Sequence, residues 1–164
     1  MTIFSQRPFY ESSMVAAHSP TANHQENNPE NRWTLPFNLA VHKAFDTIEE
    51  VLASDPEGTP ASLLTISESP KFYSNGIDPA WMASGPPEDD LKQWNDTCMP
   101  SFARPILLPI PTLTAINGHA FGAGMMFALG HDQRLQRKER GFQCAIEVAI
   151  GIRTPSPELT LFRH

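Results

Sequence analysis

The sequence has little cysteine and no long hydrophobic run, and both absences exclude classes of protein. Its two cysteines, Cys98 and Cys144, are too few for the disulfide framework of a small secreted domain, so a reducing compartment fits better. No apolar stretch approaches the ~20 residues that a membrane span needs. The net charge of −6 argues against nucleic acid as a partner, and the short basic cluster at residues 134–140 is more typical of a solvated surface.

Targeting signals are also lacking. Residues 1–27 are polar and show no sustained period of 2 or 3.6, so we predict an irregular or disordered segment. They contain no apolar core of a secretory signal, and Glu11 and Glu26 interrupt what would have to be an acid-poor transit peptide. A C-terminal Ser-Lys-Leu is absent as well. The predicted location is therefore the peroxisome, the mitochondrion or the cytoplasm.

The rest of the chain alternates between helical and strand patterns. Apolar residues recur at helical spacing over Pro36–Ser54, with Thr34 as the N-cap, and a second helix is predicted over Glu88–Phe102. Short apolar strands are predicted at Ala61–Ile66 and Leu113–Ile116. Helices that alternate with strands predict an α/β fold, in which a parallel sheet is flanked by helices.

Two glycine-containing turns follow predicted strands. After Leu113–Ile116 the chain reaches Gly122-Ala123-Gly124 and then an apolar helical run, so backbone N–H groups at that helix start lack partners. The turn in Lys71–Asp78 follows the strand Ala61–Ile66. One interpretation is that these small residues have a packing role alone and bring strand and helix close together. Two such turns, each offering one N–H, can instead form a pocket for a developing oxyanion.

Glu147 is the one acid in the apolar stretch Gly141–Gly151. If its carboxylate is buried between Ile146 and Val148, its charged form is disfavoured, and the pKa rises toward a value useful for proton transfer. An acid in such a run is also typical of the exposed face of an alternating strand. Composition alone leaves both interpretations open.

Three stretches occur together in the order and spacing of the crotonase superfamily, the enoyl-CoA hydratase/isomerase family. They are Ser74–Asp78, Pro109–Gly124, and Arg140-Gly141-Phe142 followed by Glu147–Gly151. The sequence resembles this family over roughly Asn28–His164, and it is most similar to the enoyl-CoA delta-isomerase branch. The resemblance implies a crotonase-like ββα-superhelix core.

The resemblance also implies site residues. Glu147 falls where crotonases place a catalytic glutamate, and the N–H groups of Ile77 and Ala123 fall at the positions of the oxyanion donors. The second glutamate of the hydratases is replaced by Met126, which favours isomerisation by Glu147 alone over hydration. The remaining predicted substrate-binding residues are Lys71, Tyr73, Asn75, Gly76, Asp78, Trp81, Phe121 and Gly122, together with Met126 itself.

The sequence departs from the family pattern at both ends. Crotonases begin with a β-hairpin, and no convincing strand pair precedes Asn28. They also continue beyond the segment of Glu147 with helices that complete the acyl-CoA site and the trimer or hexamer contacts. We therefore expect residues 28–164 to be a partial domain without those helices.

The predicted function is conversion of a 3-enoyl-CoA to a 2-enoyl-CoA through an oxyanion-stabilised enolate. An acyl-CoA thioester is the substrate, and neither a cofactor nor a metal is implied. Two alternatives stay open, a catalytically inactive acyl-CoA-binding remnant and an enoyl-CoA hydratase. A thioesterase or dehalogenase on the same scaffold is a further variant, because the oxyanion pocket is shared and the acids vary.

Overall fold

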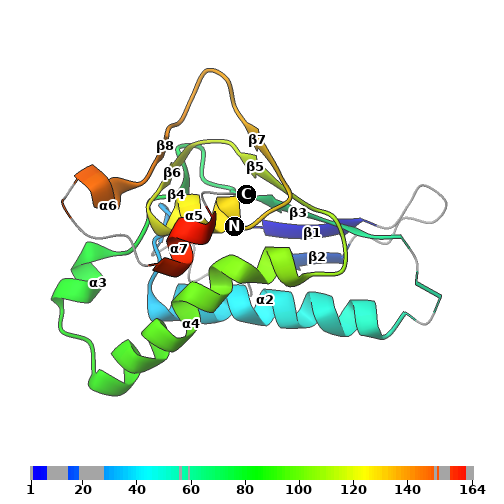
Figure 1. Cartoon of the computed structure of the whole chain (residues 1–164), viewed down its shortest axis with the longest axis horizontal. Coiled ribbons are helices and arrows are strands. Elements are labelled where there is room, and N and C mark those ends of the chain that lie inside the picture. The colour runs from blue at the N-terminus through cyan, green and yellow to red at the C-terminus, as the bar shows by residue number, and fades with distance from the viewer. Residues whose placement is uncertain are drawn as a thin grey trace.

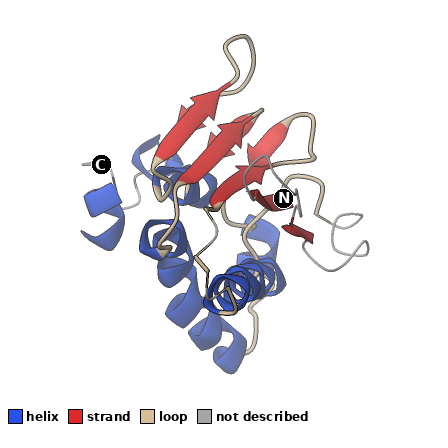
Figure 2. Cartoon of the chain, turned by 90° about the vertical axis from the view of Figure 1, so that its right-hand side faces the viewer, coloured by secondary structure: helices blue, strands red, loops and turns tan. Residues whose placement is uncertain are grey.

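The computed structural model of the chain describes residues 2–6, 15–18, 28–55, 57–58, 60–149, 151 and 156–161. Over these residues the chain forms two β-sheets and the helices that pack against them (Figure 1). In Figure 2 the helices gather on one side of the strands. The α/β class expected from the alternating pattern is confirmed.

The larger sheet has the strand order β2-β1-β3-β5-β7 among the described residues. Its parallel part consists of β3 (Ser62–Ile66), β5 (Thr112–Ile116) and β7 (Gln133–Gln136). Leu63 of β3 lies opposite Thr112 of β5. Burial alternates along β5, as expected for a strand with one face in the core.

The N-terminal prediction was wrong for two stretches. Residues 1–27 were expected to be irregular, but β1 (Thr2–Gln6) and β2 (Val15–His18) form an antiparallel pair, and β1 also pairs antiparallel with β3. The edge of β3 supplies hydrogen-bonding partners that no local sequence pattern reveals. The hairpin expected of a crotonase is therefore present; residues 1, 7–14 and 19–27 lie outside the described residues.

The smaller sheet is entirely parallel and has the order β4-β6-β8. Its strands are β4 (Phe72–Ser74), β6 (His119–Phe121) and β8 (Gln143–Cys144). Gly118 lets the strands approach closely, since a Cβ built on it would lie 2.2 Å from the carbonyl oxygen of Lys71. Because the three strands are parallel, their carboxyl ends lie at the same edge of the sheet.

Two long helices pack against each other, α2 (Leu35–Ala53) and α4 (Glu88–Leu107); α2 also contacts β2 of the larger sheet, and α4 contacts the helix α5 (Ala123–Leu129). The predicted N-cap is confirmed, because Thr34 Oγ1 accepts a hydrogen bond from the N–H of Phe37 at 3.4 Å. α4 continues five residues beyond the predicted end at Phe102, and its buried face includes Phe102 and Pro105. No helix in the described part of the chain is long and apolar enough to cross a membrane.

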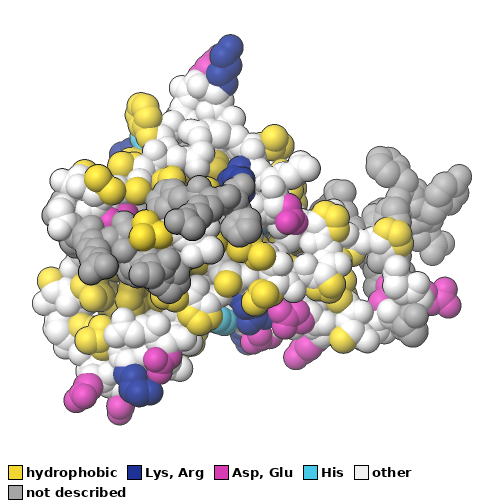
Figure 3. Space-filling view, viewed as in Figure 1, with side chains coloured by type: hydrophobic (Ala, Val, Ile, Leu, Met, Phe, Trp, Pro, Cys, Tyr) yellow, Lys and Arg dark blue, Asp and Glu magenta, His cyan; other side chains and the backbone are white. Residues whose placement is uncertain are grey.

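The shorter helices are α3 (Pro79–Ala83), α5 (Ala123–Leu129), α6 (Ile146–Ala149) and α7 (Ser156–Leu161). α5 runs into the core, where Phe127 packs with Trp33 and Phe45. Figure 3 shows the basic tip of the loop between β7 and β8 projecting from the body, where residues 137–140 are exposed.

Candidate active site

The three segments that were predicted to carry chemistry lie at the carboxyl ends of the three parallel strands of the smaller sheet. Residues 75–78 follow β4, residues 122–124 follow β6, and residues 145–147 follow β8. The N–H of Gly122 donates to the carbonyl of Cys144 at 2.9 Å, which holds the last two segments side by side. Carboxyl ends of parallel strands are the usual location of ligand sites in open α/β sheets.

The turn after β4 presents the backbone of Ile77. Gly76 has a φ of +75°, in the left-handed region that glycine tolerates best. The N–H of Ile77 makes no hydrogen bond to any residue that the structure describes, and its side chain is 37% exposed. The first predicted oxyanion donor therefore has no partner in the part of the chain that the structure describes.

The turn after β6 presents the backbone of Ala123, the first residue of α5. An N–H at this position has no acceptor within its own helix, and none of the described residues accepts from it. A Cβ built on Gly124 would lie 2.5 Å from Cβ of Ser74, so only glycine allows α5 to begin this close to β4.

The two turns are adjacent. A Cβ built on Gly76 would lie 3.9 Å from the backbone nitrogen of Ala123 and 2.9 Å from the carbonyl oxygen of Phe121. Two N–H groups that have no partner among the described residues thus occur on neighbouring turns, which is the arrangement that an oxyanion pocket needs.

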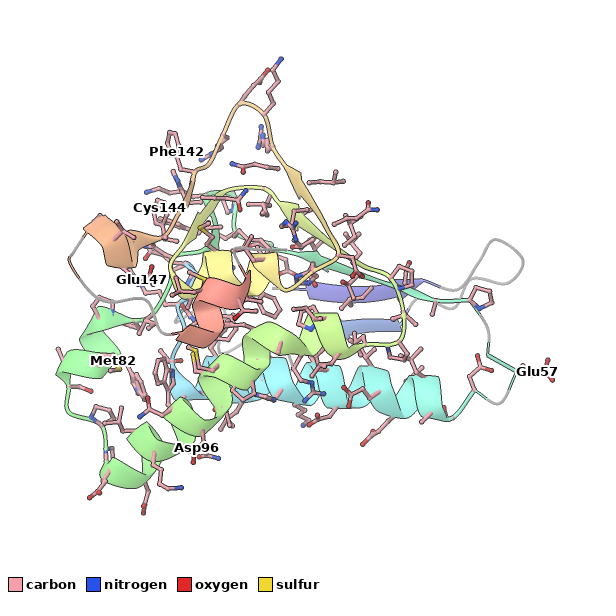
Figure 4. All side chains as sticks on the ribbon, in the orientation of Figure 1. Glu57, Met82, Asp96, Phe142, Cys144 and Glu147 are labelled. Atoms are coloured by element: carbon pink, nitrogen blue, oxygen red, sulfur yellow. The ribbon has the colours of Figure 1, made fainter. Side chains whose placement is uncertain are left out.

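Glu147 lies in α6, next to the second turn. Its Oε1 is 2.8 Å from the position that a Cβ on Gly122 would occupy, so the missing side chain of Gly122 makes room for the carboxylate. Figure 4 shows Glu147 between α6 and the start of α5. Its Oε2 is buried without a hydrogen-bond partner among the described residues. Buried carboxylate oxygens normally have a partner, so an oxygen without one among the described residues, close to the turn of Ala123, makes Glu147 a candidate for a functional role.

Asn75 was predicted to bind substrate, but its side chain is engaged within the protein. Its Nδ2 donates to Glu30 Oε2 at 2.8 Å, and its backbone N–H donates to the Glu30 carbonyl at 2.9 Å. The same carboxylate forms an ion pair with Arg32 at 2.7 Å. The hydrogen bond from Asn75 and the charge of Arg32 hold the pKa of the Glu30 carboxyl below its ordinary value, against the opposing effect of burial.

Two predicted substrate-binding side chains lie in the core instead. Tyr73 is fully buried, and Thr114 donates a hydrogen bond of 2.9 Å to its hydroxyl oxygen. Burial raises the pKa of the Tyr73 phenol. Met126 is also fully buried, on the inner face of α5. Both side chains are therefore part of the core in this structure, and their contact with substrate stays a prediction.

Asp78 and Trp81 have structural contacts around α3. The Asp78 carboxylate caps this helix by accepting from the N–H groups of Ala80 at 2.8 Å and Trp81 at 3.2 Å. The half-buried Trp81 ring lies 5.9 Å from that of Trp94 on α4. The cap fixes the start of α3 directly after the turn that presents Ile77.

Lys71 lies away from the carboxylate. It lines a surface hollow of about 480 Å³, together with residues 28–31, 68–70 and 72. Neither Glu147 nor the two turns that carry Ile77 and Ala123 line this hollow. Phe121 lies on β6 with its ring 5.2 Å from that of His119. The structure thus brings Gly76, Ile77, Gly122, Ala123 and Glu147 together and leaves Lys71 apart from them.

Sequence reasoning missed the segment that lies along the first turn. Residues 28–33 run beside residues 73–78. Asn31 donates to the carbonyl of Tyr73 at 3.0 Å, and Ser74 Oγ donates to the carbonyl of Asn31 at 2.7 Å. No local pattern indicates this pairing, because the bonds are between residues more than 40 positions apart.

Known proteins of similar sequence and structure identify the fold. No family model matches the chain. The structure resembles that of an enoyl-CoA hydratase from Geobacillus kaustophilus with a TM-score of 0.65 at 23% sequence identity, covering 92% of this chain and 54% of that one. This likeness defines the class, a crotonase fold, and confirms the fold expected from the sequence.

The sequence relatives narrow the class. The chain is 39% identical over 116 residues to enoyl-CoA delta isomerase 3 of Arabidopsis thaliana, covering 67% of this chain and 49% of the relative. It is 36% identical over 118 residues to the peroxisomal enoyl-CoA delta isomerase 2 of the same plant, with the same coverage. The chain spans about half the length of these curated relatives. The chain thus resembles the crotonase superfamily in its fold and enoyl-CoA delta isomerases in its sequence.

Proposed function

We propose that this chain carries the catalytic centre of an enoyl-CoA isomerase, which moves a double bond from carbon 3 to carbon 2 of an acyl thioester. The observation that supports this most directly is the carboxylate of Glu147 against the turn of Gly122, beside two N–H groups that have no partner among the described residues. The similarity to delta isomerases agrees with it, although the chain spans about half of their length.

The two N–H groups are assigned to the thioester oxygen. Removal of a proton from carbon 2 leaves an enolate, whose negative charge develops on that oxygen. Donors from Ile77 and Ala123 would stabilise this charge, and one such donor contributes about 3–4 kcal/mol in known cases. Since both donors are backbone groups on tightly packed turns, they need little reorganisation during the reaction.

Glu147 is assigned the proton transfer. Its carboxylate takes the proton from carbon 2, the double bond shifts from carbons 3 and 4 to carbons 2 and 3, and the same carboxyl returns the proton to carbon 4. No water and no electron are gained or lost. The unpaired Oε2 leaves one carboxylate oxygen available to substrate.

Hydration is less well supported. Family hydratases use two glutamates, and at the position of the second the side chain is Met126, which is apolar and fully buried. A thioether there neither orients nor activates a water molecule. Isomerisation needs a single carboxylate, which is what this site offers.

The proposal includes the acyl-CoA thioester as substrate, with no cofactor beyond it and no metal. Among the described residues, no cluster of His, Cys, Asp and Glu could hold a metal ion. Homo-oligomerisation is proposed from the family resemblance. Peroxisome, mitochondrion and cytoplasm remain the proposed locations, and the names of two relatives specify the peroxisome.

The test is an assay of the purified chain with a 3-enoyl-CoA, following the conjugated 2-enoyl thioester by its absorbance. Glu147→Gln is expected to lower kcat by about 10²–10⁴-fold, the usual contribution of a general base, and to leave binding of the CoA ester intact. Glu139→Gln is the matched control, because Glu139 is an exposed acid in the loop before β8.

A deuterium label separates the possible mechanisms. Substrate deuterated at carbon 2 should deliver part of its label to carbon 4 if one carboxyl moves the proton. Formation of a 3-hydroxyacyl-CoA would instead indicate a hydratase. Full activity in Glu147→Gln would refute the assignment, and ligand binding without turnover in the wild type would favour a non-catalytic acyl-CoA-binding protein.

A further inference from the structure

Trp33 lies directly before the N-cap of α2, and its backbone contacts the turn of the first proposed donor. Its N–H donates to the carbonyl of Gly76 at 2.8 Å, and its own carbonyl accepts from the N–H of Asp78 at 3.1 Å. The two bonds enclose Ile77, with which Trp33 forms an isolated parallel bridge. Ile77 is thus flanked on both sides by bonds to a single residue.

The bond to Gly76 controls the direction of the Ile77 N–H. The carbonyl of Gly76 and the N–H of Ile77 belong to the same peptide group, which is planar and trans, so they point in opposite directions. When Trp33 holds the carbonyl on one side, the N–H must project from the other. The orientation of the donor is therefore fixed by a hydrogen bond in which the donor itself takes no part.

The side chain of Trp33 contacts the helix that carries the second proposed donor. The indole is fully buried, and its centroid lies 5.5 Å from the ring of Phe127, which is four residues after Ala123 in α5. The rings of Phe37 and Phe102 also make edge contacts with the indole, each with a distance of 5.2 Å between ring centroids. A shift of the indole would therefore move α5 or be resisted by it.

We propose that Trp33 is a positioning residue that sets the orientation of the two N–H donors relative to each other. Its backbone fixes the peptide plane of Ile77, and its ring supports the helix that begins at Ala123. It acts only through these groups and does not touch the substrate. This inference rests on the proposed function, because it assumes that both N–H groups serve one oxyanion.

A second set of contacts supports the same turn. Glu30 holds Asn75 by its backbone carbonyl and by its carboxylate, and Arg32 pairs with that carboxylate. These bonds keep residues 30–33 parallel to the turn. Trp33 is the member of this segment that reaches both donors.

The direct test removes the N–H of Trp33 and keeps its ring. Replacement of Trp33 by indole-3-lactic acid converts the backbone N–H into an ester oxygen. The matched control is the corresponding ester at Ser54, whose N–H donates to the carbonyl of Glu50 at 3.0 Å, far along α2 from the site. Trp33→Phe and Trp33→Leu test the ring, with Ile48→Ala as a control for loss of core packing.

The readouts are kcat, KM and the carbonyl stretching band of a bound 2-enoyl-CoA labelled with ¹³C at the thioester carbon. In the wild type, the two donors should move this band to lower frequency than in free ligand. We expect the ester at Trp33 to lower kcat by about 10- to 100-fold with little change in KM, and to return the band most of the way to the free value. Trp33→Phe should retain more of the wild-type shift of this band than Trp33→Leu, because it keeps an aromatic ring at this position.

The outcomes separate this inference from the proposed function. An ester at Trp33 with the wild-type band and kcat would overturn the positioning role alone. A wild-type chain that shifts the band but shows no turnover would overturn the isomerase, and the band would still test Trp33. A wild-type chain without shift or turnover would overturn both. If Trp33→Leu does not fold, the ester decides the question, because it retains the whole side chain.

Discussion

At the scale of the residue, the candidate site depends on side chains that are absent. Gly122 has a φ of +48°. A Cβ built on it would lie 2.8 Å from Glu147 Oε1, which is closer than real Cβ contacts. The carboxylate can therefore approach the turn only because residue 122 is glycine. The position of the Glu147 carboxylate thus depends on Gly122, a residue that has no side chain.

This coupling predicts the effect of Gly122→Ala. The methyl group would displace the carboxylate of Glu147, so we expect kcat to fall by about 10- to 100-fold, as misplacement of a catalytic group by an ångström can cost. Isomerase kinetics give the measurement.

Gly58→Ala is the matched control for Gly122→Ala. Gly58 also has a positive φ, +62°, and no atom within 4 Å of a built Cβ, so Gly58→Ala places a side chain at positive φ without the clash. Equal activity loss in both variants would assign the effect to strain alone.

Motifs predicted which segments of the chain would come together. The oxyanion candidates Ile77 and Ala123 and the acid Glu147 were predicted from motifs, and the structure brings their segments to one edge of a sheet, while their roles stay predictions. The burial of Tyr73 and Met126 was not predicted, because whether a side chain faces the surface or the core depends on neighbours distant in the sequence. No local pattern contains that information.

At the scale of the element, α5 and β4 form the joint that holds the two turns together. Gly124 lies in the first turn of α5, where a Cβ would be 2.5 Å from Cβ and 2.7 Å from the carbonyl oxygen of Ser74. Ser74 is itself fixed to the segment before α2 through its bond to Asn31. A small displacement here separates both donors.

Gly124→Ala should therefore destabilise the protein, against the usual trend for helices. Replacing a helical glycine by alanine ordinarily stabilises by up to ~1 kcal/mol. Here overpacking against Ser74 is expected to outweigh that gain and cost a net of about 1–3 kcal/mol. Urea unfolding gives the measurement, and an unchanged or raised midpoint would show that α5 can move away without cost.

The elements themselves were predictable where their pattern was periodic. Thr34 and the apolar spacing after it gave α2 correctly, and β3 and β5 followed from short apolar runs. The N-terminal pair β1 and β2 was missed because its pairing with β3 is a long-range contact. Glu147 lies in the one-turn helix α6. The sequence predicted no helix there and left open a buried acid or the exposed face of an alternating strand.

At the scale of the whole molecule, a buried histidine ties stability to pH. His131 is 2% exposed, its Nε2 lies 2.8 Å from the hydroxyl of Thr65, and its Nδ1 lies 3.0 Å from the carbonyl of Phe127. Burial lowers the pKa of His131 to about 4. The imidazole is consequently neutral in the folded protein at pH values where it is charged in the unfolded chain.

Stability should therefore fall with acidification between pH 6.5 and about 4. In this window the unfolded state binds a proton at His131 that the folded state excludes, so lower pH favours unfolding. At most, this shift contributes about 3 kcal/mol. Thermal unfolding across the pH range measures it, and His131→Gln should show a flatter profile; parallel profiles would show that other groups control the acid response.

Both proposed donors are groups that every amino acid except proline possesses. Many different side chains could therefore occupy position 77, which is 37% exposed, without removing the hydrogen bond that the reaction uses, whereas Ala123 is buried in the core and leaves room for small side chains alone. Mutational tolerance should be high at Ile77, although its N–H takes part in the reaction, and low at Gly76, Gly122 and Gly124, where a Cβ would meet a neighbouring atom within 3 Å. A deep mutational scan scored on activity would read as a map of permitted shapes, with Glu147 as the single position where a functional group is required.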